Sequence, residues 1–460
     1  MTDKRSGGRP PRKSGSPKSP PRGRTDAPVR HTGAPPAFES RYPRPELPRD
    51  SFAALFHAKL RALHRAQLPP ERGACTDADG QRCRVCHASS HPYPQEADAR
   101  DAALRDFWKL HQLVGPARPL VRTGSGRWYR IVSKRKAWQP QRGGARLGLI
   151  DPQGGPAVEI GRCAIEAPAH ADIYHTLATA LQSPAGRPLG DELRHAVIKG
   201  NADEQTLILS VKGLDPIVMR SATAVSKLLT REHVNIKGLF LFEDETDGRY
   251  YLGTRHADAQ PSMRKLFGAS EIFHRIGGKP FLHHPLSFTQ VNAEGGERLV
   301  QTVAAFLKPE KTIAFYDFYC GYGMFTLSLA PDLRAATGIE LSHASVASAK
   351  ANATRQHAAN ARFVRAGVTP ETVYRTMARS TPDDIVLLDP PRGGVEEGVI
   401  EAIADRRPAR VAHIFCAIDL VPRDVARWSA SGYTVRSIIP FDNFAGTDEV
   451  EVLVTLERAT

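Results

Sequence analysis

From about residue 290 to the C-terminus, short apolar runs typical of strands alternate with helical patterns. Strands separated by helices form parallel crossovers, and such crossovers build an open, doubly wound α/β sheet with helices on both faces. The last two runs lie too close together for a helical crossover, so we expect the final strand to enter antiparallel, as a hairpin. A ligand of such a sheet binds at the carboxyl ends of the strands. The expected strands are 312–318, 335–339, 362–364, 384–388, 410–415, 434–439 and 450–456.

Two other regions precede this alternation. Residues 116–284 contain Gly-punctuated alternating runs, which predict a strand-rich domain of antiparallel strands interrupted by one helix near 170–182. Residues 51–115 predict two amphipathic helices that flank a cysteine-containing loop. We therefore expect a helical, Cys-rich segment (51–115), a smaller strand-rich α+β domain (116–284) and a doubly wound domain (285–460).

Residues 1–50 have a different composition from the rest of the chain. They carry twelve Lys and Arg against five Asp and Glu, so their net charge of +7 is half of the chain's +14. They also hold eleven of the 36 prolines and few large apolar residues. Such a segment buries too little surface to offset its ordering entropy, and we expect a disordered basic tail. The overall excess of positive charge favours a polyanionic partner.

Cysteine usage and hydropathy exclude two classes of protein. Six cysteines in 460 residues are too few for a disulfide framework, which argues against a small secreted module and for reduced thiols. No run of 18 apolar residues occurs, and no apolar stretch follows the basic N-terminus. We expect a cytoplasmic monomer without a membrane partner.

A glycine-containing loop follows the first strand of the C-terminal domain. Gly321 and Gly323 permit a tight turn and the close approach of a ligand, and Glu340 ends the next strand, where a carboxylate can accept both ribose hydroxyls of an adenosine. Because no third glycine completes the dinucleotide fingerprint, the loop suits S-adenosylmethionine better than a pyrophosphate. The alternative is that these are ordinary turn glycines and a surface glutamate.

The fourth strand of the domain leads directly into Asp389-Pro390-Pro391-Arg392. Two consecutive prolines cannot continue a central strand, so they hold the preceding carboxylate and the following guanidinium rigidly at the expected ligand edge. Enzymes that methylate exocyclic amines typically have an aromatic residue where Arg392 stands, which weakens that assignment. The alternative is that the prolines merely terminate the strand.

Cys416 ends the next strand, and Glu451 is a carboxylate within the otherwise apolar closing strand. A thiol and a base beside a methyl donor suit methylation of uracil at C5, which is a poor nucleophile. A thiolate adds to C6, the resulting enolate attacks the methyl group, and a base removes the C5 proton before the thiolate leaves. The alternative for Cys416 is a buried structural thiol.

These residues resemble the RNA uracil-C5 methyltransferases, with motifs in the family's order and approximate spacing across about residues 75–460. The resemblance implies a Rossmann-like methyltransferase sheet and an S-adenosylmethionine site contacted by Gln290, Tyr319, Glu340 and Asp389. It further implies that Cys416 is the nucleophile and that Glu451 is the proton acceptor. The matching segments are Phe288-Thr289-Gln290-Val291-Asn292, Asp317-Phe318-Tyr319-Cys320-Gly321-Tyr322-Gly323, Gly338-Ile339-Glu340, Asp389-Pro390-Pro391-Arg392-Gly393-Gly394, Cys416 and Asp442 to Glu451.

Four further cysteines, Cys75, Cys83, Cys86 and Cys163, have the spacing of a soft-metal site. From spacing alone, a [4Fe–4S] cluster and a structural zinc ion are equally compatible. The resemblance is to the four-thiolate iron–sulfur site of the branch that methylates 23S ribosomal RNA, the RlmC type. It therefore favours the cluster over zinc, and 23S rRNA over transfer RNA as the RNA partner.

Two departures from the family pattern concern the nucleophile and the base. Phe415 and Ala417 stand where the family has Ser and Asn beside the nucleophile. The family's Asp-Met-Phe-Pro-x-Thr-x-His-x-Glu becomes Asp442-Asn443-Phe444-Ala445-Gly446-Thr447-Asp448-Glu449-Val450-Glu451. Glu449 thus replaces His, and on a strand it shares a face with Glu451, where a like charge raises the carboxylate pKa. An alternative of another class is a non-catalytic RNA-binding or ribosome-assembly factor that has kept the fold.

Overall fold

The computed structural model describes most of the chain beyond the N-terminal tail. Residues 1–46 of the predicted disordered tail and the proposed metal ligand Cys75 lie outside the described residues. The described residues are 47–63, 83, 85–89, 91–113, 115–140, 143–150, 159–246, 252 and 262–459.

A seven-stranded sheet organises the C-terminal part, in the order β11-β10-β9-β12-β13-β15-β14. Strands β9 to β13 pair in parallel, whereas β15 is antiparallel to both of its neighbours. The doubly wound α/β class and the antiparallel final strand are thereby confirmed. The strands are β9 (Ala314–Phe318), β10 (Ala335–Glu340), β11 (Ala361–Arg365), β12 (Ile385–Leu388), β13 (Arg410–Phe415), β14 (Tyr433–Phe441) and β15 (Glu451–Arg458).

Helices cover both faces of this sheet, as the alternation of side chains along the strands requires. In β12, Ile385 and Leu387 pack into one buried cluster with α6, α7 and α8, while Val386 and Leu388 pack into another with α9, α10 and α11. The helices are α6 (Ala293–Leu307), α7 (Met324–Leu329), α8 (His343–Arg355), α9 (Pro370–Thr376), α10 (Val399–Asp405) and α11 (Val421–Ala430). Short 3₁₀ turns are η2 (Ala330–Asp332) and η3 (Ile418–Leu420).

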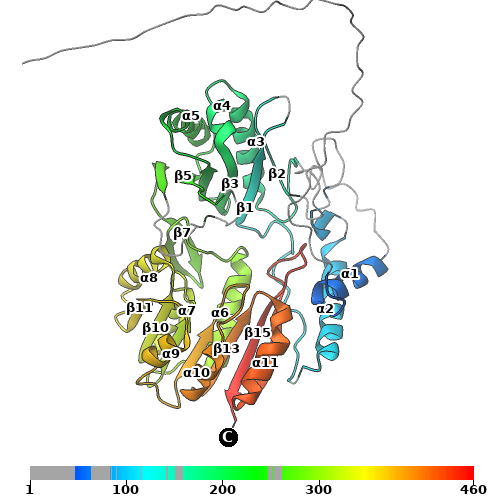
Figure 1. The fold of residues 1–460 in the computed structure, drawn as a ribbon, viewed down its shortest axis with the longest axis vertical. Coiled ribbons are helices and arrows are strands. Elements are labelled where there is room, and N and C mark those ends of the chain that lie inside the picture. Colours follow the sequence, from blue (N-terminus) through cyan, green and yellow to red (C-terminus); the bar gives the residue numbers. More distant parts are fainter. Residues whose placement is uncertain are drawn as a thin grey trace, which may run out of the picture. The chain divides into compact units, whose positions relative to one another are not determined.

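The N-terminal helices pack onto the C-terminal domain rather than forming a separate core. Helix α1 (Phe52–Ala62) begins at the Ser51 cap, and helix α2 (Tyr93–Leu110) follows the 3₁₀ turn η1 (His87–Ser89). Phe52 and Phe56 of α1 are fully buried in the cluster that also contains β15 and α11. Figure 1 shows α1 and α2 beside β15 and α11. Segments far apart in sequence therefore share one core.

A second, six-stranded sheet forms the middle domain, in the order β2-β1-β3-β4-β5-β6. Most of its pairs are antiparallel, but β4 and β5 are parallel, so the expectation of purely antiparallel strands was wrong. The cause is α5, a crossover helix between these strands that begins at the Asp215 cap. The elements are β1 (Val132–Trp138), β2 (Arg146–Gly148), α3 (Pro168–Gln182), α4 (Arg187–Glu192), β3 (Leu193–Gly200), β4 (Gln205–Val211), α5 (Pro216–Glu232), β5 (Ile236–Glu243) and β6 (Met263–Gly268).

The expected single helix near 170–182 corresponds to α3, and α4 and α5 are additional. These three helices bury one face of the sheet. A two-stranded hairpin, β7 (Ile272–Ile276) and β8 (Lys279–His283), then leads into the C-terminal domain. The buried Lys199 of β3 donates a hydrogen bond to the carbonyl of Ser287 after this hairpin, at 2.7 Å, which ties the two domains together.

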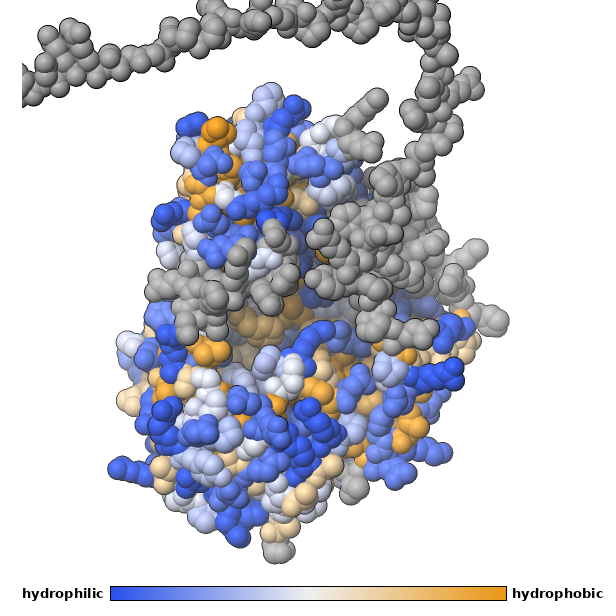
Figure 2. All heavy atoms as spheres, in the orientation of Figure 1, coloured by the Kyte–Doolittle hydropathy of each residue, from blue (hydrophilic) through white to orange (hydrophobic). Residues whose placement is uncertain are grey.

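The face of the molecule drawn in Figure 2 is mostly hydrophilic, with apolar side chains in small separate groups. Single exposed apolar residues such as Ile217 and Val234 are normal for a water-exposed surface. Among the described helices, none combines the length and the apolar character needed to cross a membrane.

Candidate active site

The loop after β9 has a backbone that only certain residues adopt without strain. Tyr319, Gly321 and Gly323 all have positive φ, at 69°, 55° and 89°. A Cβ atom at Gly323 would lie 2.9 Å from the Phe363 ring, so glycine is required there on both counts. The loop is tied to the next strand because the Cys320 N–H donates to the carbonyl of Ile339, at 3.0 Å.

Glu340, at the end of β10, holds this loop in place. One carboxylate oxygen accepts from the Gly321 N–H at 3.1 Å, and the other accepts from the Ser342 N–H at 2.7 Å. Each carboxylate oxygen has a second lone pair, so both can still accept from a ligand hydroxyl. The structure thus brings together Gly321, Gly323 and Glu340, as the sequence predicts for a nucleoside site.

Asp317 is a buried carboxylate that sequence reasoning quoted only as part of a motif. Its Oδ2 accepts from the N–H and the hydroxyl of Thr326, at 3.0 and 2.5 Å. Its Oδ1 has no hydrogen-bond partner within the described part of the chain. Burial raises the pKa of Asp317 to about 7. A buried, half-satisfied carboxylate beside the loop is suited to a ligand with a donor group.

Gln290 and Tyr319 are two further residues expected at the cofactor. Gln290 is buried on the segment before α6, where its side chain packs against Gly296. Tyr319 is partly buried, and burial together with the neighbouring Glu396 raises its pKa to about 12. Its phenol therefore stays protonated and can donate a hydrogen bond at neutral pH.

Asp389 and Pro390 lie next to the loop, at the end of β12. The Asp389 N–H donates to the carbonyl of Phe318 at 3.2 Å, which fixes the Asp-Pro-Pro segment against β9. Withdrawal from solvent and the carboxylates of Glu451 and Asp317 raise the pKa of Asp389 well above its usual range. The Cys416 thiol donates to the carbonyl of Pro390, at 3.8 Å.

Cys416 directly follows β13, and Glu451 is the first residue of β15, the antiparallel neighbour of β13. The last paired rung of the two strands joins Phe415 to Val452, so Cys416 and Glu451 both lie next to this rung in the sequence, at the same end of the strand pair. Burial, Asp389 and Glu451 raise the Cys416 pKa to about 11, and burial raises the Glu451 pKa to about 7. The site thus holds a protonated thiol beside a carboxyl group that gains or loses its proton near neutral pH.

Asn443 and Phe415 shape the surroundings of this pair. The Asn443 side-chain amide donates to Oε2 of Glu451, which favours the carboxylate form. Asn443 stands where the family pattern has Met, and it fits because Gly295 leaves room for its side chain. Phe415 stacks on His413, with ring centroids 3.9 Å apart, so it points into the core and not toward the thiol.

The expectation that Glu449 shares a strand face with Glu451 was wrong. Strand β15 begins only at Glu451, and the Glu449 carboxylate instead pairs with Arg392, at 2.7 Å. Glu449 is not among the groups that raise the pKa of Glu451. Its partner Arg392 lowers the Cys416 pKa, which partly opposes the effect of burial.

Three of the four candidate metal-ligating cysteines come together, although they are up to 80 residues apart. Cys83 and Cys163 are buried in one small apolar cluster, and Cys86 packs against it. Burial, Glu166 and Cys86 raise the pKa of Cys163 well above its usual range. The Cys163 thiol therefore stays protonated unless a metal displaces its proton.

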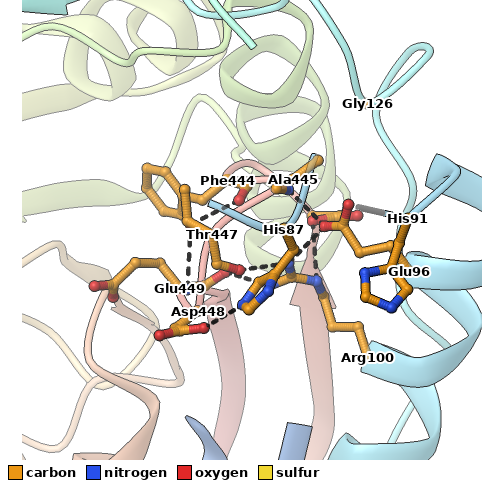
Figure 3. A network of polar contacts seen from close by, with 12 residues as sticks. His87, His91, Glu96, Arg100, Gly126, Phe444, Ala445, Thr447, Asp448 and Glu449 are labelled. Atoms are coloured by element: carbon orange, nitrogen blue, oxygen red, sulfur yellow. Dashed lines mark hydrogen bonds and ion pairs between the residues drawn. The ribbon is translucent and has the colours of Figure 1, made fainter. Parts of the chain in front are cut away.

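The segment that precedes Glu451 is held by the N-terminal helices (Figure 3). Arg100 of α2 is fully buried, and its guanidinium donates to the carbonyls of Thr447 and Glu449, at 2.7 and 2.5 Å. It also pairs with Glu96 at 3.0 Å and with Asp442 at 3.4 Å. We call residues 442–450 the base segment, because they lead into the proposed base.

Replacing Arg100 by methionine is expected to lower the free energy of unfolding by ~3–5 kcal/mol, because the buried Asp442 would lose its paired cation and the buried Glu96 would keep only Arg127. Urea unfolding followed by circular dichroism measures the change. Arg105→Ala is the control, since Arg105 pairs with Asp101 on the surface and its loss is expected to change stability by less than about 1 kcal/mol. Equal effects of the two variants would contradict this role of Arg100.

The C-terminal domain matches a known protein family. Residues 275–459 match the family described as tRNA (Uracil-5-)-methyltransferase. An RNA methyltransferase of Gloeobacter violaceus, itself described as uncharacterized, is 28% identical over 419 residues, which cover 88% of this chain and 87% of the relative. The 23S rRNA (uracil(1939)-C(5))-methyltransferase RlmD of Aeromonas hydrophila is 29% identical over 383 residues, or 82% of this chain and 81% of the relative.

A solved structure shares the fold. The tRNA (uracil-54, C5)-methyltransferase of Pyrococcus abyssi, determined in complex with S-adenosyl-L-homocysteine, superimposes with a TM-score of 0.59. The match covers 82% of this chain and 87% of that chain, at 17% identity. The methyltransferase fold predicted from the sequence is therefore confirmed.

Proposed function

Because the chain belongs to the RNA uracil-C5 methyltransferase family, we propose that it methylates C5 of a uridine in RNA, with S-adenosylmethionine as donor and 23S rRNA as the preferred substrate. The observation that carries this proposal is that Cys416, directly after β13, and Glu451, at the start of the neighbouring β15, lie close enough for the Glu451 charge to raise the Cys416 pKa. A thiol and a titrating carboxyl group are the two groups that C5 methylation of uracil requires.

In the proposed mechanism, Cys416 acts as the nucleophile and Glu451 as the base. The Cys416 thiol loses its proton to solvent and its sulfur bonds to C6 of the uracil, which breaks the C5–C6 π bond and places negative charge on the C5–C4–O4 enolate. S-adenosylmethionine supplies an electrophilic methyl group that C5 takes up. Glu451 as carboxylate then removes the C5 proton, the electron pair re-forms the C5–C6 double bond, and the sulfur leaves C6.

The residues at the sheet edge fit the cofactor. Glu340 offers two carboxylate oxygens to a ribose, and the unpaired Oδ1 of the buried Asp317 offers an acceptor to a cationic amino group. Asp389, at the end of β12, lies next to this loop, and Tyr319 is part of it. We propose that these residues, with Gln290, Gly321 and Gly323, bind S-adenosylmethionine.

Replacing Glu340 by alanine is expected to raise the dissociation constant for S-adenosylmethionine by about 10- to 100-fold, because charge-assisted hydrogen bonds contribute about 1.5–3 kcal/mol. The Gly321 N–H would also lose its acceptor. Isothermal titration calorimetry measures the affinity. Glu310→Ala is the matched control, because Glu310 is exposed and precedes the amino end of β9, and it is expected to bind as the wild type does. An unchanged affinity in Glu340→Ala would exclude this role.

We also propose that Cys83, Cys86 and Cys163, together with Cys75, hold a [4Fe–4S] cluster. Its role would be structural, and it would join the N-terminal segment to the middle domain. The shared apolar surroundings of the three described cysteines support a soft, thiolate-bound group. Zinc remains the alternative, and the visible absorption of protein purified anaerobically distinguishes the two.

The middle domain, residues 116–284, is the proposed RNA-binding part. Trp128 is 43% exposed and suits stacking on an unpaired base. Tyr129 is less available, because its hydroxyl donates to the carbonyl of Ala445 at 2.8 Å. Two further aromatic residues of this domain that we propose as stacking candidates, Tyr250 and Tyr251, lie outside the described residues.

Mass mapping of 5-methyluridine in a deletion strain tests the substrate. Loss of one 5-methyluridine from 23S rRNA, restored by the wild-type gene, is the expected result. Loss from transfer RNA instead would favour the second candidate substrate, which the matched family's description and the Pyrococcus abyssi neighbour support. An unchanged set of 5-methyluridines in both RNAs would contradict the proposed reaction.

A further inference from the structure

Three side chains of the kinds that bind metal ions come together outside the Cys416 site. They are His57 of α1, His87 of η1 and Asp448 of the base segment. Nε2 of His57 lies 2.7 Å from Oδ1 of Asp448, and Nε2 of His87 lies 2.6 Å from the same oxygen. All three donor atoms lie within 4.8 Å of one another. The proposed methyl transfer uses none of these side chains.

In addition to forming these two hydrogen bonds, the three side chains offer the ligand set of a divalent cation. Both imidazoles approach one carboxylate oxygen through Nε2, so hydrogen bonding alone requires a proton on both Nε2 atoms. A divalent ion satisfies both nitrogen lone pairs and the carboxylate at once. With zinc–ligand bonds of about 2.0–2.2 Å, tetrahedral ligand atoms lie roughly 3.3–3.5 Å apart. To bind such an ion, Nε2 of each imidazole has to move away from Oδ1 of Asp448 by less than about 1 Å.

The two histidines are held by their surroundings. The His87 ring packs edge-on against Phe56, with ring centroids 5.4 Å apart, and the backbone N–H of His87 donates to the carbonyl of Gly446 at 2.7 Å. The His57 ring packs edge-on against His87, with centroids 5.3 Å apart. Phe56 is fully buried, so the helix that carries His57 has a fixed position.

Asp448 is held from both sides and remains open to solvent. The carbonyls of its neighbours, Thr447 and Glu449, accept hydrogen bonds from the buried Arg100 (Figure 3). The side chains of His57, His87 and Asp448 are 29%, 23% and 25% exposed. An ion can therefore enter a site whose ligands are already in place.

We propose that His57, His87 and Asp448 bind a divalent first-row transition metal ion such as Zn²⁺, with water as a further ligand. Two imidazoles and a carboxylate leave an open position, as in three-ligand zinc sites. The ion links α1 and η1 to the base segment, which lies directly before Glu451. This site is distinct from the thiolate site, because none of its ligands is a cysteine.

The test is zinc binding by the full-length protein and by three variants. Free Zn²⁺ is buffered with a chelator, and bound metal is counted by mass spectrometry. His57→Ala and Asp448→Asn are expected to bind one Zn²⁺ fewer, or to weaken that binding at least about 10-fold. His175→Ala is the control, because His175 is exposed on α3, and it is expected to bind as the wild type does.

Two further measurements distinguish the loss of this metal site from misfolding of a variant and from metal binding by the cysteine thiolates. In chelator, the Tm of His57→Ala and Asp448→Asn is expected to match that of the wild type, and Zn²⁺ is expected to raise only the Tm of the wild type and of His175→Ala. Co²⁺ that fills the site is expected to show visible ligand-field bands without a thiolate charge-transfer band. Equal stoichiometry and affinity in all four proteins, or Co²⁺ bound only through thiolates, would overturn the proposal.

Discussion

Replacing Cys416 by serine is expected to lower the rate of methyl transfer by a factor on the order of 10⁴ or more. A serine hydroxyl is far less acidic than a thiol and adds poorly to C6, so the enolate does not form. Affinity for S-adenosylmethionine is expected to stay within about threefold, since Cys416 contacts the carbonyl of Pro390 and not the cofactor loop. Transfer of a labelled methyl group to RNA and calorimetric binding measure the two quantities.

Ser429→Ala, at an exposed position on α11, controls for the handling of the variants and is expected to keep the wild-type rate. If Cys416→Ser retained more than a hundredth of the wild-type rate, the nucleophilic role of Cys416 would be wrong. Loss of cofactor binding together with activity would point to a structural role for the thiol instead.

Replacing Glu451 by glutamine is expected to lower kcat by about 10²- to 10⁴-fold and to trap the enzyme on its RNA. Without a base, the C5 proton stays after methyl transfer, and the bond between Cys416 and C6 cannot break by elimination. The adduct is measured as a slow band on a denaturing gel. Glu449→Gln is the matched control, because Glu449 pairs with the exposed Arg392, and it is expected to release its RNA normally. A Glu451→Gln enzyme that turns over without adduct would exclude the proposed base.

The same pair of groups determines the pH dependence. Glu451 must be deprotonated to act as base, and its pKa is raised to about 7, so activity is expected to rise as the pH increases through 7. The Cys416 pKa is raised to about 11, so the thiolate fraction also increases over this range. The logarithm of kcat against pH is therefore expected to be steeper below pH 7 than above it. In Glu451→Gln this change of slope is expected to disappear.

The parts of the fold that follow local patterns were predictable. Apolar strands and intervening helices indicated the doubly wound sheet, and the short spacing between the last two runs indicated the antiparallel entry of β15. Helix α5 (Pro216–Glu232) was missed, although Asp215 followed by Pro216 is a typical helix start. The parallel pair β4 and β5 was missed with it.

The site was predictable where it depends on strand ends. Cys416, Asp389 and the loop after β9 each follow an apolar strand, and the sheet brings those ends to one edge. Glu449 was misplaced because Arg100, some 350 residues away, holds the base segment out of the strand. The contacts of His57 and His87 with Asp448 join residues 391 and 361 positions apart. No local pattern indicates pairings of that separation.

The most direct test of the account is reaction of the protein with RNA that contains 5-fluorouridine, in the presence of S-adenosylmethionine. Fluorine at C5 cannot leave as a proton, so the addition and the methyl transfer proceed while the elimination is blocked. We expect a stable protein–RNA adduct in the wild type, attached through the peptide that contains Cys416, and none in Cys416→Ser. Methylation of unmodified RNA without any adduct on the fluorinated RNA, or an adduct through another residue, would contradict the central claim.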